Sequence, residues 1–381
     1  MSAPIPGLAT RAATGRYAQT FGSACAAGHY SDFLNLHLRL SSLGIGTFPG
    51  AATDAVDAAY AGIVHHAALA GINVFDTAAH YRYGRSARAL GEGLRRAFAD
   101  GVERAQVFVV AKGGFLAFDD GPPADVARWF DAHVVAPGLG RREDLAGQHC
   151  LSPRYVEAQL EAVRAATGLD SLDAFLLDQP EVHYAALGKE RAHRRMAEVF
   201  EALERAARDG RIGCYGISSF DALRVETDAV LFQSLTSLLA LAERAAHAAG
   251  GDARTRHALR IVQLPFNQAM TEGFTRFSQA TGEGNVASSI QAAHQLRVYA
   301  MGSHAMGKGA FAGTGAESVR ARLADLPNDA QRALQFARST PGIGTALVGV
   351  STPAHLEDVL AVARTPPLAR ADYLRLFERV P

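Results

Sequence analysis

The chain has 381 residues, of which 48% are hydrophobic, so it can bury a sizeable core as two ordinary domains or as one large α/β barrel. Lys and Arg together number 38, as do Asp and Glu, and no segment carries a long run of like charge. This balance offers no electrostatic surface for nucleic acid, so we expect no nucleic-acid partner. The most apolar stretch, residues 229–249, is interrupted by polar and charged side chains and predicts an amphipathic or buried helix, not a membrane span.

The cysteines and the N-terminal residues indicate the cellular compartment in which the protein is expected. Cys25, Cys150 and Cys214 lie far apart and form neither a C-x-x-C pair nor a metal-ligand spacing. Reduced thiols in a cytoplasmic protein are the simplest interpretation, and we expect no metal site. The sequence MSAPIPGL at the start lacks a charged segment followed by a long apolar one, so it predicts no secretory signal.

Short β-branched segments alternate with longer helical patterns from residue 43 onwards. The predicted strands are 43–47, 72–76, 107–112, 172–178, 212–217, 261–265, 297–301 and 344–349, and the predicted helices are 53–69, 84–99, 152–167, 188–209, 222–248, 281–295, 315–338 and 353–364. Apolar strands alternating with helices favour a parallel sheet covered on both faces, and eight such units form a (β/α)8 TIM barrel. A doubly wound sheet is the alternative, but no G-x-G-x-x-G follows a strand and opens a helix.

Two segments lie outside this repeat. Residues 9–40 precede the first strand and are expected to form a hairpin that caps the bottom of the barrel. Residues 113–151 form a long irregular insertion after the third strand, so they would overhang the C-terminal mouth of the barrel as a lid. We therefore expect a single barrel domain over residues 1–381, with an N-terminal cap and a lid-like loop.

Ionisable residues end three neighbouring strands. Asp76, Lys112 and Asp178 close the second, third and fourth strands, and Tyr81 follows the second strand by one loop. The C-terminal ends of barrel strands converge on one mouth, so we expect these four side chains to meet. As plain core residues, three ionisable groups would be expensive to bury. For any one of them taken alone, a structural Lys–Asp pair is the alternative.

The motifs around these residues resemble the aldo-keto reductase superfamily. In chain order they are GINVFDTA at 71–78, Tyr81, GRS at 84–86, LGEGL at 90–94, VFVVAK at 107–112, GRIGCYGISS at 210–219, VQ at 262–263 and VGVSTPAHL at 348–356. They span nearly the whole chain, and the D-T-A-x-x-Y signature together with the strand-end lysine is specific. GQHCLSP at 147–153 also resembles a bacterial subgroup with a long third loop.

This resemblance implies reduction of a small-molecule carbonyl with NADP or NAD as the cofactor. Tyr81 would protonate the carbonyl oxygen, Lys112 would lower the pKa of the phenol, and Asp76 would pair with Lys112. The resemblance also implies cofactor contacts. They involve Ser218, Ser219 and Gln263 at the nicotinamide, Gly302, Ser303 and Lys308 at the pyrophosphate, and Gly349, Ser351, His355 and Asp358 in the loop and helix after the eighth strand.

The sequence departs from the family at Asp178, where the family has a histidine that hydrogen-bonds the carbonyl oxygen. Members that reduce a carbon–carbon double bond beside a ketone carry Glu at this position. A protonated carboxyl in an apolar site can donate a hydrogen bond to a carbonyl, whereas an ionised one would repel an oxyanion and could pair with Lys112. His80 and His183 are candidate replacements for the imidazole.

A second departure lies in the cofactor tail. Residues 349–359 contain no Lys or Arg for a 2′-phosphate, and Val359 stands where the family has an asparagine against the adenine. The choice between NADPH, NADH and no dinucleotide therefore stays open.

Three hypotheses for the function follow. An NAD(P)H-dependent oxidoreductase acting on a ketone, aldehyde or conjugated enone is favoured by Asp76, Tyr81, Lys112, Ser218 and Gln263. A redox-neutral lyase, dehydratase or isomerase would use Tyr81, Lys112 and Asp178 as acid and base. A catalytically silent binding subunit is the third, and retention of Tyr81 and Lys112 argues against it. The substrate and the oligomeric state are not predicted by the sequence.

Overall fold

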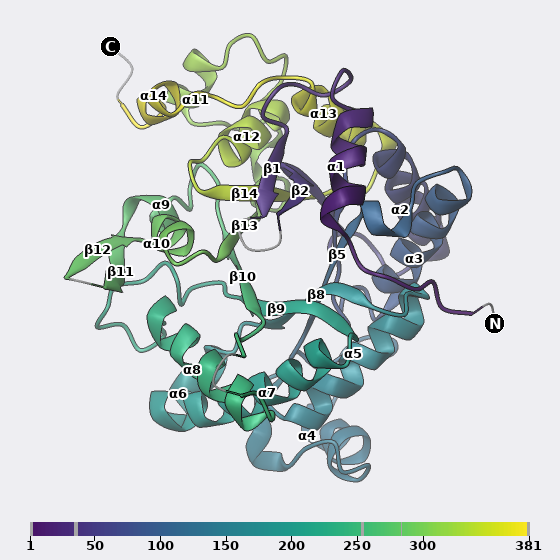
Figure 1. The fold of residues 1–381 in the computed structure, drawn as a ribbon, viewed down its shortest axis with the longest axis vertical. Coiled ribbons are helices and arrows are strands. Elements are labelled where there is room, and N and C mark those ends of the chain that lie inside the picture. Colours follow the sequence, from purple (N-terminus) through teal and green to yellow (C-terminus); the bar gives the residue numbers. More distant parts are fainter. Residues whose placement is uncertain (1–2, 34–36, 253–254, 283, 379–381) are drawn as a thin grey trace.

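A computed structural model describes residues 3–33, 37–252, 255–282 and 284–378 (Figure 1). Its centre is a closed barrel of eight parallel strands that follow the chain order around the ring. They are β3 (Leu43–Gly46), β4 (Val74–Asp76), β5 (Phe108–Gly113), β8 (Leu172–Asp178), β9 (Ile212–Ser218), β10 (Leu259–Pro265), β13 (Tyr299–Ser303) and β14 (Ile343–Gly349). Pairing of β14 with β3 closes the ring, and the predicted (β/α)8 barrel is confirmed.

The strands are apolar because both of their faces are buried. In β5, Phe108 and Val110 belong to the cluster that fills the barrel interior, whereas Val109 and Ala111 belong to the layer between the strands and the helices. Successive side chains of a strand point to opposite faces, so one strand supplies both layers. A continuous apolar run is therefore the pattern that this architecture requires.

Helices surround the barrel (Figure 1). Five predictions are confirmed to within one or two residues by α2 (Asp54–Leu69), α3 (Arg85–Ala99), α5 (Pro153–Thr167), α7 (Lys189–Arg208) and α13 (Pro353–Ala363). The other three predictions were too long. Helix α8 covers only Leu235–Ala248, α10 only Ser289–Gln295, and the region 315–338 divides into α11 (Glu317–Arg322) and α12 (Asp329–Arg338).

Capping residues explain where the three shortened helices begin. Ser234, Ser288 and Asn328 precede α8, α10 and α12, and each side chain accepts a hydrogen bond from a main-chain N–H in the first turn of its helix. Before α10 the chain forms a hairpin of β11 (Phe277–Gly282) and β12 (Asn285–Ser288). Residue 283, in the predicted helix 281–295, lies outside the described residues.

The N-terminal segment contains a helix that the sequence analysis did not predict. Helix α1 (Arg11–Thr20) precedes a hairpin of β1 (Tyr30–Phe33) and β2 (Leu38–Ser41), while residues 34–36 of the expected cap lie outside the described residues. The ring of Phe33 stacks on that of Tyr299, with centroids 4.6 Å apart, and so joins the interior cluster of the barrel.

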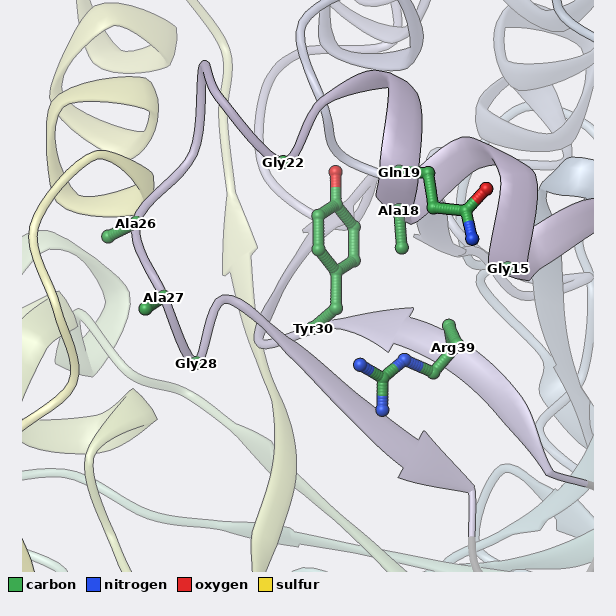
Figure 2. A pocket seen from close by; sticks show the side chains of 9 residues that line it. All are labelled: Gly15, Ala18, Gln19, Gly22, Ala26, Ala27, Gly28, Tyr30 and Arg39. Carbon is green, nitrogen blue, oxygen red and sulfur yellow. The ribbon is translucent and has the colours of Figure 1, made fainter.

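A shallow cavity of about 310 Å³ lies beside this segment (Figure 2). Two of its polar side chains already have partners. Tyr30 Oη donates to the main-chain oxygen of Gly71 at 2.8 Å, and the Arg39 guanidinium pairs with Asp32 at 3.0 Å. The remaining wall consists mainly of glycine and alanine, so the cavity presents little chemistry.

The insertion after β5 is more ordered than the predicted irregular loop. It contains α4 (Val126–Phe130), a π-helical turn at Asp131–Val135, and a short hairpin of β6 (Leu145–Ala146) and β7 (His149–Cys150). Its own apolar cluster includes Leu116, Phe118, Phe130, Val134 and Cys150, packed with Tyr155 of α5. Whether this segment moves as a lid stays a prediction.

Two features are absent from the described part of the chain. None of its helices has both the length and the apolar character needed to cross a bilayer. Nor do three His, Cys, Asp or Glu side chains within those ranges come together in a way that could hold a metal ion. The three cysteines are buried and free of disulfides.

Candidate active site

A cavity of about 660 Å³ opens at the C-terminal ends of the barrel strands. This volume is typical of sites for small molecules and cofactors. Its wall includes most of the residues proposed from the sequence, namely Asp76, Tyr81, Asp178, Ser218, Ser219, Gln263, Ser303, Lys308, Gly349, Ser351, His355 and Asp358. Lys112 and Gly302 are buried and are not part of the wall.

Lys112 joins Asp76 to Tyr81 at the base of the cavity. Its Nζ donates to Asp76 Oδ1 and lies 3.2 Å from Tyr81 Oη. The second oxygen of Asp76 accepts from Gln263 Nε2 at 3.0 Å, so both carboxylate oxygens are engaged. Strands β4 and β5 pair with Asp76 opposite Val110, and this register brings Lys112, two residues further along, to the same mouth.

Burial and charge act in opposite directions on these groups. Burial raises the pKa of Tyr81 above its ordinary value, and the neighbouring Lys112 charge offsets part of that rise. Burial disfavours the Lys112 ammonium, but the charges of Asp76 and Asp178, together with the hydrogen bond to Asp76, outweigh it and raise the Lys112 pKa. At neutral pH, Tyr81 is therefore a protonated phenol beside a charged ammonium, and it can donate a proton.

Asp178 ends β8 on another side of the same cavity. Burial raises its pKa to about 6, although the Lys112 charge and a hydrogen bond from Ser218 lower it in part. Its Oδ2 lies 4.0 Å from His80 Nε2. Burial, together with the Lys112 charge, lowers the pKa of His80 to about 3, so this imidazole is neutral.

The two candidate replacements for the family histidine lie in different places. His80 lines the cavity beside Asp178. His183 is fully buried, and its Nε2 lies 2.9 Å from His149 Nδ1. His149 Nε2 in turn lies 2.7 Å from the main-chain oxygen of Asp178. Of the two, His80 alone lies on the cavity wall.

Two residues near the site were missed from the sequence. His149 lies within the GQHCLSP segment, which was noted only for its resemblance to a subgroup. Glu181 follows Asp178 by three residues, and its Oε1 accepts from Ser219 Oγ at 2.8 Å and from the Phe220 N–H at 2.9 Å. The Ser219 hydroxyl therefore has a protein partner already. The signal available in the sequence was a second carboxylate only three residues after Asp178.

The outer part of the cavity runs from β13 and β14 to α13. Ser303, Lys308, Ser351 and His355 line it and provide two hydroxyls, one ammonium and one imidazole. Asp358 also lines it, and its Oδ1 is held by Asn328 Nδ2 and Gln331 Nε2, each at 2.8 Å. An ammonium and hydroxyl donors suit a pyrophosphate, and a carboxylate oxygen suits a ribose hydroxyl, so these residues could hold a dinucleotide.

Comparison with known proteins identifies the family and the fold of the chain. Residues 42–230 match the model of the aldo/keto reductase family. No curated protein sequence matches the chain.

Solved structures with the same fold include an aldo/keto reductase from Klebsiella pneumoniae in complex with NADP and acetate. It is 15% identical, with a TM-score of 0.59 over 91% of this chain and 93% of that one. Another is the aldo-keto reductase AKR11C1 from Bacillus halodurans in its holo form, 15% identical, with a TM-score of 0.56 over 91% of this chain and 94% of that one. These two likenesses show the barrel fold, and the family model matches residues 42–230. The chain belongs to the aldo-keto reductase superfamily.

Proposed function

We propose that the protein is a nicotinamide-dependent oxidoreductase that reduces a small-molecule ketone, aldehyde or conjugated enone. The contacts that support this most are those of the Lys112 ammonium, which bridges Asp76 and the phenol of Tyr81. A proton donor for a newly formed alkoxide has to be neutral before the reaction and stabilised as an anion after it. Tyr81 beside Lys112 meets both requirements.

The roles of the side chains follow from their contacts. When bound, the dinucleotide would supply a hydride to the carbonyl carbon. Tyr81 Oη would donate its proton to the carbonyl oxygen, and Lys112 Nζ, 3.2 Å away, would stabilise the phenolate that remains. Asp76 and Gln263 would position Lys112, because Gln263 holds the carboxylate oxygen that Lys112 leaves free.

Asp178 favours a second candidate function, a redox-neutral lyase, dehydratase or isomerase. A carboxyl with a pKa raised to about 6 is largely ionised at neutral pH and can accept a proton from carbon or oxygen. Tyr81 would then return a proton on the other side of the substrate. Below pH 6, the same carboxyl is protonated and would suit an enone, since it could donate to the carbonyl.

Calorimetry with NADH and NADPH, followed by turnover of the Tyr81→Phe variant, tests the proposal. We expect micromolar binding of one nucleotide, nearly unchanged in Tyr81→Phe, with turnover reduced by a factor of about 10²–10⁴. Tyr299→Phe is the matched control, because that buried hydroxyl contacts Thr345 at the other end of the barrel. Full turnover in Tyr81→Phe would contradict the role of Tyr81 as the proton donor. If neither nucleotide binds, the redox-neutral or the silent-subunit hypothesis takes its place.

A further inference from the structure

His80 and Asp178 face each other across a gap at the inner end of the cavity. The distance between His80 Nε2 and Asp178 Oδ2 is 4.0 Å, which is too long for a hydrogen bond between them. Both residues line the cavity, with 20% of the His80 side chain and 5% of the Asp178 side chain exposed. Both side chains therefore face the cavity, and they do not form a hydrogen bond with each other.

The protonation states of the two side chains make His80 a hydrogen-bond donor and Asp178 an acceptor. The His80 imidazole is neutral, because burial and the nearby Lys112 charge lower its pKa to about 3. Its Nδ1 is buried and has no hydrogen-bond partner among the described residues. The Asp178 carboxylate faces Nε2 and attracts the proton to that nitrogen. His80 thus presents an N–H, and Asp178, once ionised, presents a lone pair.

One oxygen atom can bridge these two groups. An atom about 2.8 Å from each of two points that are 4.0 Å apart lies about 2 Å to one side of the line joining them, at hydrogen-bond distance from both. To satisfy both, it has to accept from the N–H and donate to the carboxylate. A hydroxyl group does both, whereas a carbonyl oxygen only accepts and a methyl group does neither.

We propose that His80 and Asp178 bind a hydroxyl group of the substrate, on the carbon next to the carbonyl that Tyr81 protonates. The substrate class is then an α-hydroxy ketone or α-hydroxy aldehyde. This inference rests on the proposed reductase function. His80 directly precedes Tyr81, and their rings are 4.9 Å apart and nearly perpendicular, so two adjacent oxygens of one small molecule can reach both residues.

A second ring beside Tyr81 has a different character. Phe48 packs edge-on against the Tyr81 ring, with centroids 5.0 Å apart, and 51% of its surface is exposed at the cavity. A substrate bound to Tyr81 would therefore meet both a polar pair and an apolar ring. This combination suits a carbonyl with one hydroxylated and one apolar substituent.

The test compares hydroxyacetone with butanone, which has a methyl group in place of the hydroxyl. We expect wild-type kcat/KM to favour hydroxyacetone by at least about 100-fold, because a site built for a hydroxyl discriminates strongly against its absence. A hydroxyl also makes the carbonyl more electrophilic in any enzyme. The informative quantity is therefore the change of this ratio between the wild type and His80→Phe.

We expect the ratio to fall at least tenfold in His80→Phe and to recover in part in His80→Gln, whose amide can donate. The matched control is His294→Phe, an exposed histidine of α10 that should leave the ratio unchanged. An unchanged ratio in a folded His80→Phe protein, with both ketones still reduced, would overturn the inference and leave the reductase function standing.

The opposite failure is distinguishable. If the wild type binds neither nucleotide and reduces neither ketone, the proposed function fails. Ligand-detected NMR with the same two ketones then decides the inference. Binding of hydroxyacetone that is stronger than that of butanone and weakened by His80→Phe would support the hydroxyl site, and equal binding of the two would refute it.

Discussion

His149 Nε2 lies 2.7 Å from the main-chain oxygen of Asp178, so the insertion after β5 holds the end of β8. Because a carbonyl only accepts, this contact places the proton on Nε2 and leaves Nδ1 to accept from His183 at 2.9 Å. A hydrogen-bonded chain thus runs from His183 through His149 to Asp178. The next residue, Gln179, has a φ of 50° in the left-handed region, which costs free energy unless its surroundings fix it.

Replacing His149 should destabilise the protein strongly. His149→Phe keeps a ring of similar size but leaves the Asp178 carbonyl and the His183 N–H buried without partners. Each such group costs about 1–3 kcal/mol, so we expect the free energy of unfolding to fall by about 2–5 kcal/mol. Urea unfolding measures this, with His133→Phe as the control, since His133 is an exposed histidine of the same insertion. Equal losses in the two variants would show that the buried chain contributes nothing special.

Asp178 should make stability depend on pH. Its pKa in the folded protein is raised from 3.8 to about 6, mainly by burial, so the folded state holds the proton more tightly than the unfolded state. The stabilisation of the folded state by this tighter proton binding is fully present below pH 3.8 and is lost as the pH rises through 6. At pH 8 the buried charge costs on the order of 2–3 kcal/mol.

Asp178→Asn should therefore be more stable than the wild type at pH 8 by about that amount, and the difference should shrink toward pH 4. Urea unfolding at both pH values provides the measurement. The control is Asp54→Asn, because 99% of that side chain is exposed. A stability difference that is the same at both pH values would contradict the raised pKa of Asp178.

The barrel was predictable because its strands carry their own signal. Continuous apolar runs such as Val107–Ala111 are required where both faces of a strand are buried, so all eight strands could be located. The helices were harder, because hydrophobic periodicity continues past a cap. Helix α8 begins only after its cap Ser234, later than the predicted start at residue 222, and the hydrophobic pattern does not reveal this cap.

The candidate site was predictable to the same degree as the topology. Asp76, Lys112 and Asp178 meet because strand ends meet, and no side-chain detail is needed for that. What the sequence did not yield is side-chain direction. The places of His80 in the cavity and of His183 behind it depend on how each ring is turned. Likewise, the Ser219 hydroxyl is engaged by Glu181 only because the loop after β8 folds back.

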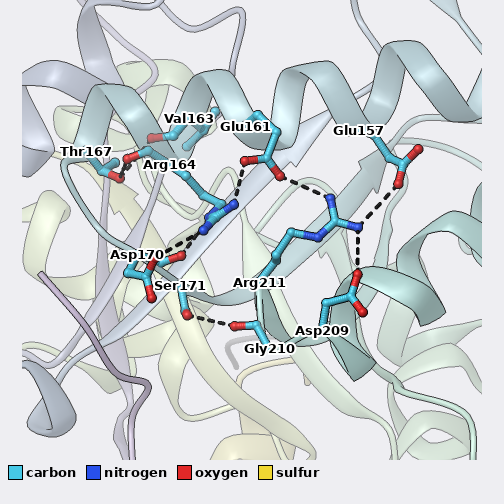
Figure 3. Close-up of polar contacts among 10 residues, drawn as sticks. All are labelled: Glu157, Glu161, Val163, Arg164, Thr167, Asp170, Ser171, Asp209, Gly210 and Arg211. Carbon is cyan, nitrogen blue, oxygen red and sulfur yellow. Dashed lines mark hydrogen bonds and ion pairs between the residues drawn. The ribbon is translucent and has the colours of Figure 1, made fainter. Parts of the chain in front are cut away.

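An ion-pair network at the start of β9 offers a test of electrostatic stabilisation (Figure 3). Arg211 contacts Glu161 at 3.1 Å and both Glu157 and Asp209 at 3.4 Å. Arg211→Met keeps most of the packing and removes these pairs. We expect a loss of about 1 kcal/mol in the free energy of unfolding at low salt, and a smaller loss at 1 M salt.

Arg141→Met is the control for this network, because Arg141 pairs with Glu143 at 3.7 Å on the open surface and should contribute less than about 0.5 kcal/mol. Chemical unfolding at two salt concentrations measures both variants. A loss in Arg211→Met that does not depend on salt would assign its effect to packing of the arginine stem and not to the ion pairs.

Asp178→His should change which carbonyl compounds are reduced. A histidine at the end of β8 restores a donor for a carbonyl oxygen, and its larger ring would fill the 4.0 Å gap in front of His80. We therefore expect kcat/KM for propanal to rise at least tenfold, while the ratio of hydroxyacetone to butanone falls. Asp178→Phe is the matched control, since its ring fills the same gap without a donor and should bring no gain with propanal. Asp178→His could fold and bind the nucleotide without any rise in kcat/KM for propanal. The difference from a generic aldehyde reductase would then extend beyond this residue. The hydrogen bond from Ser219 to Glu181 would be the next contact to change.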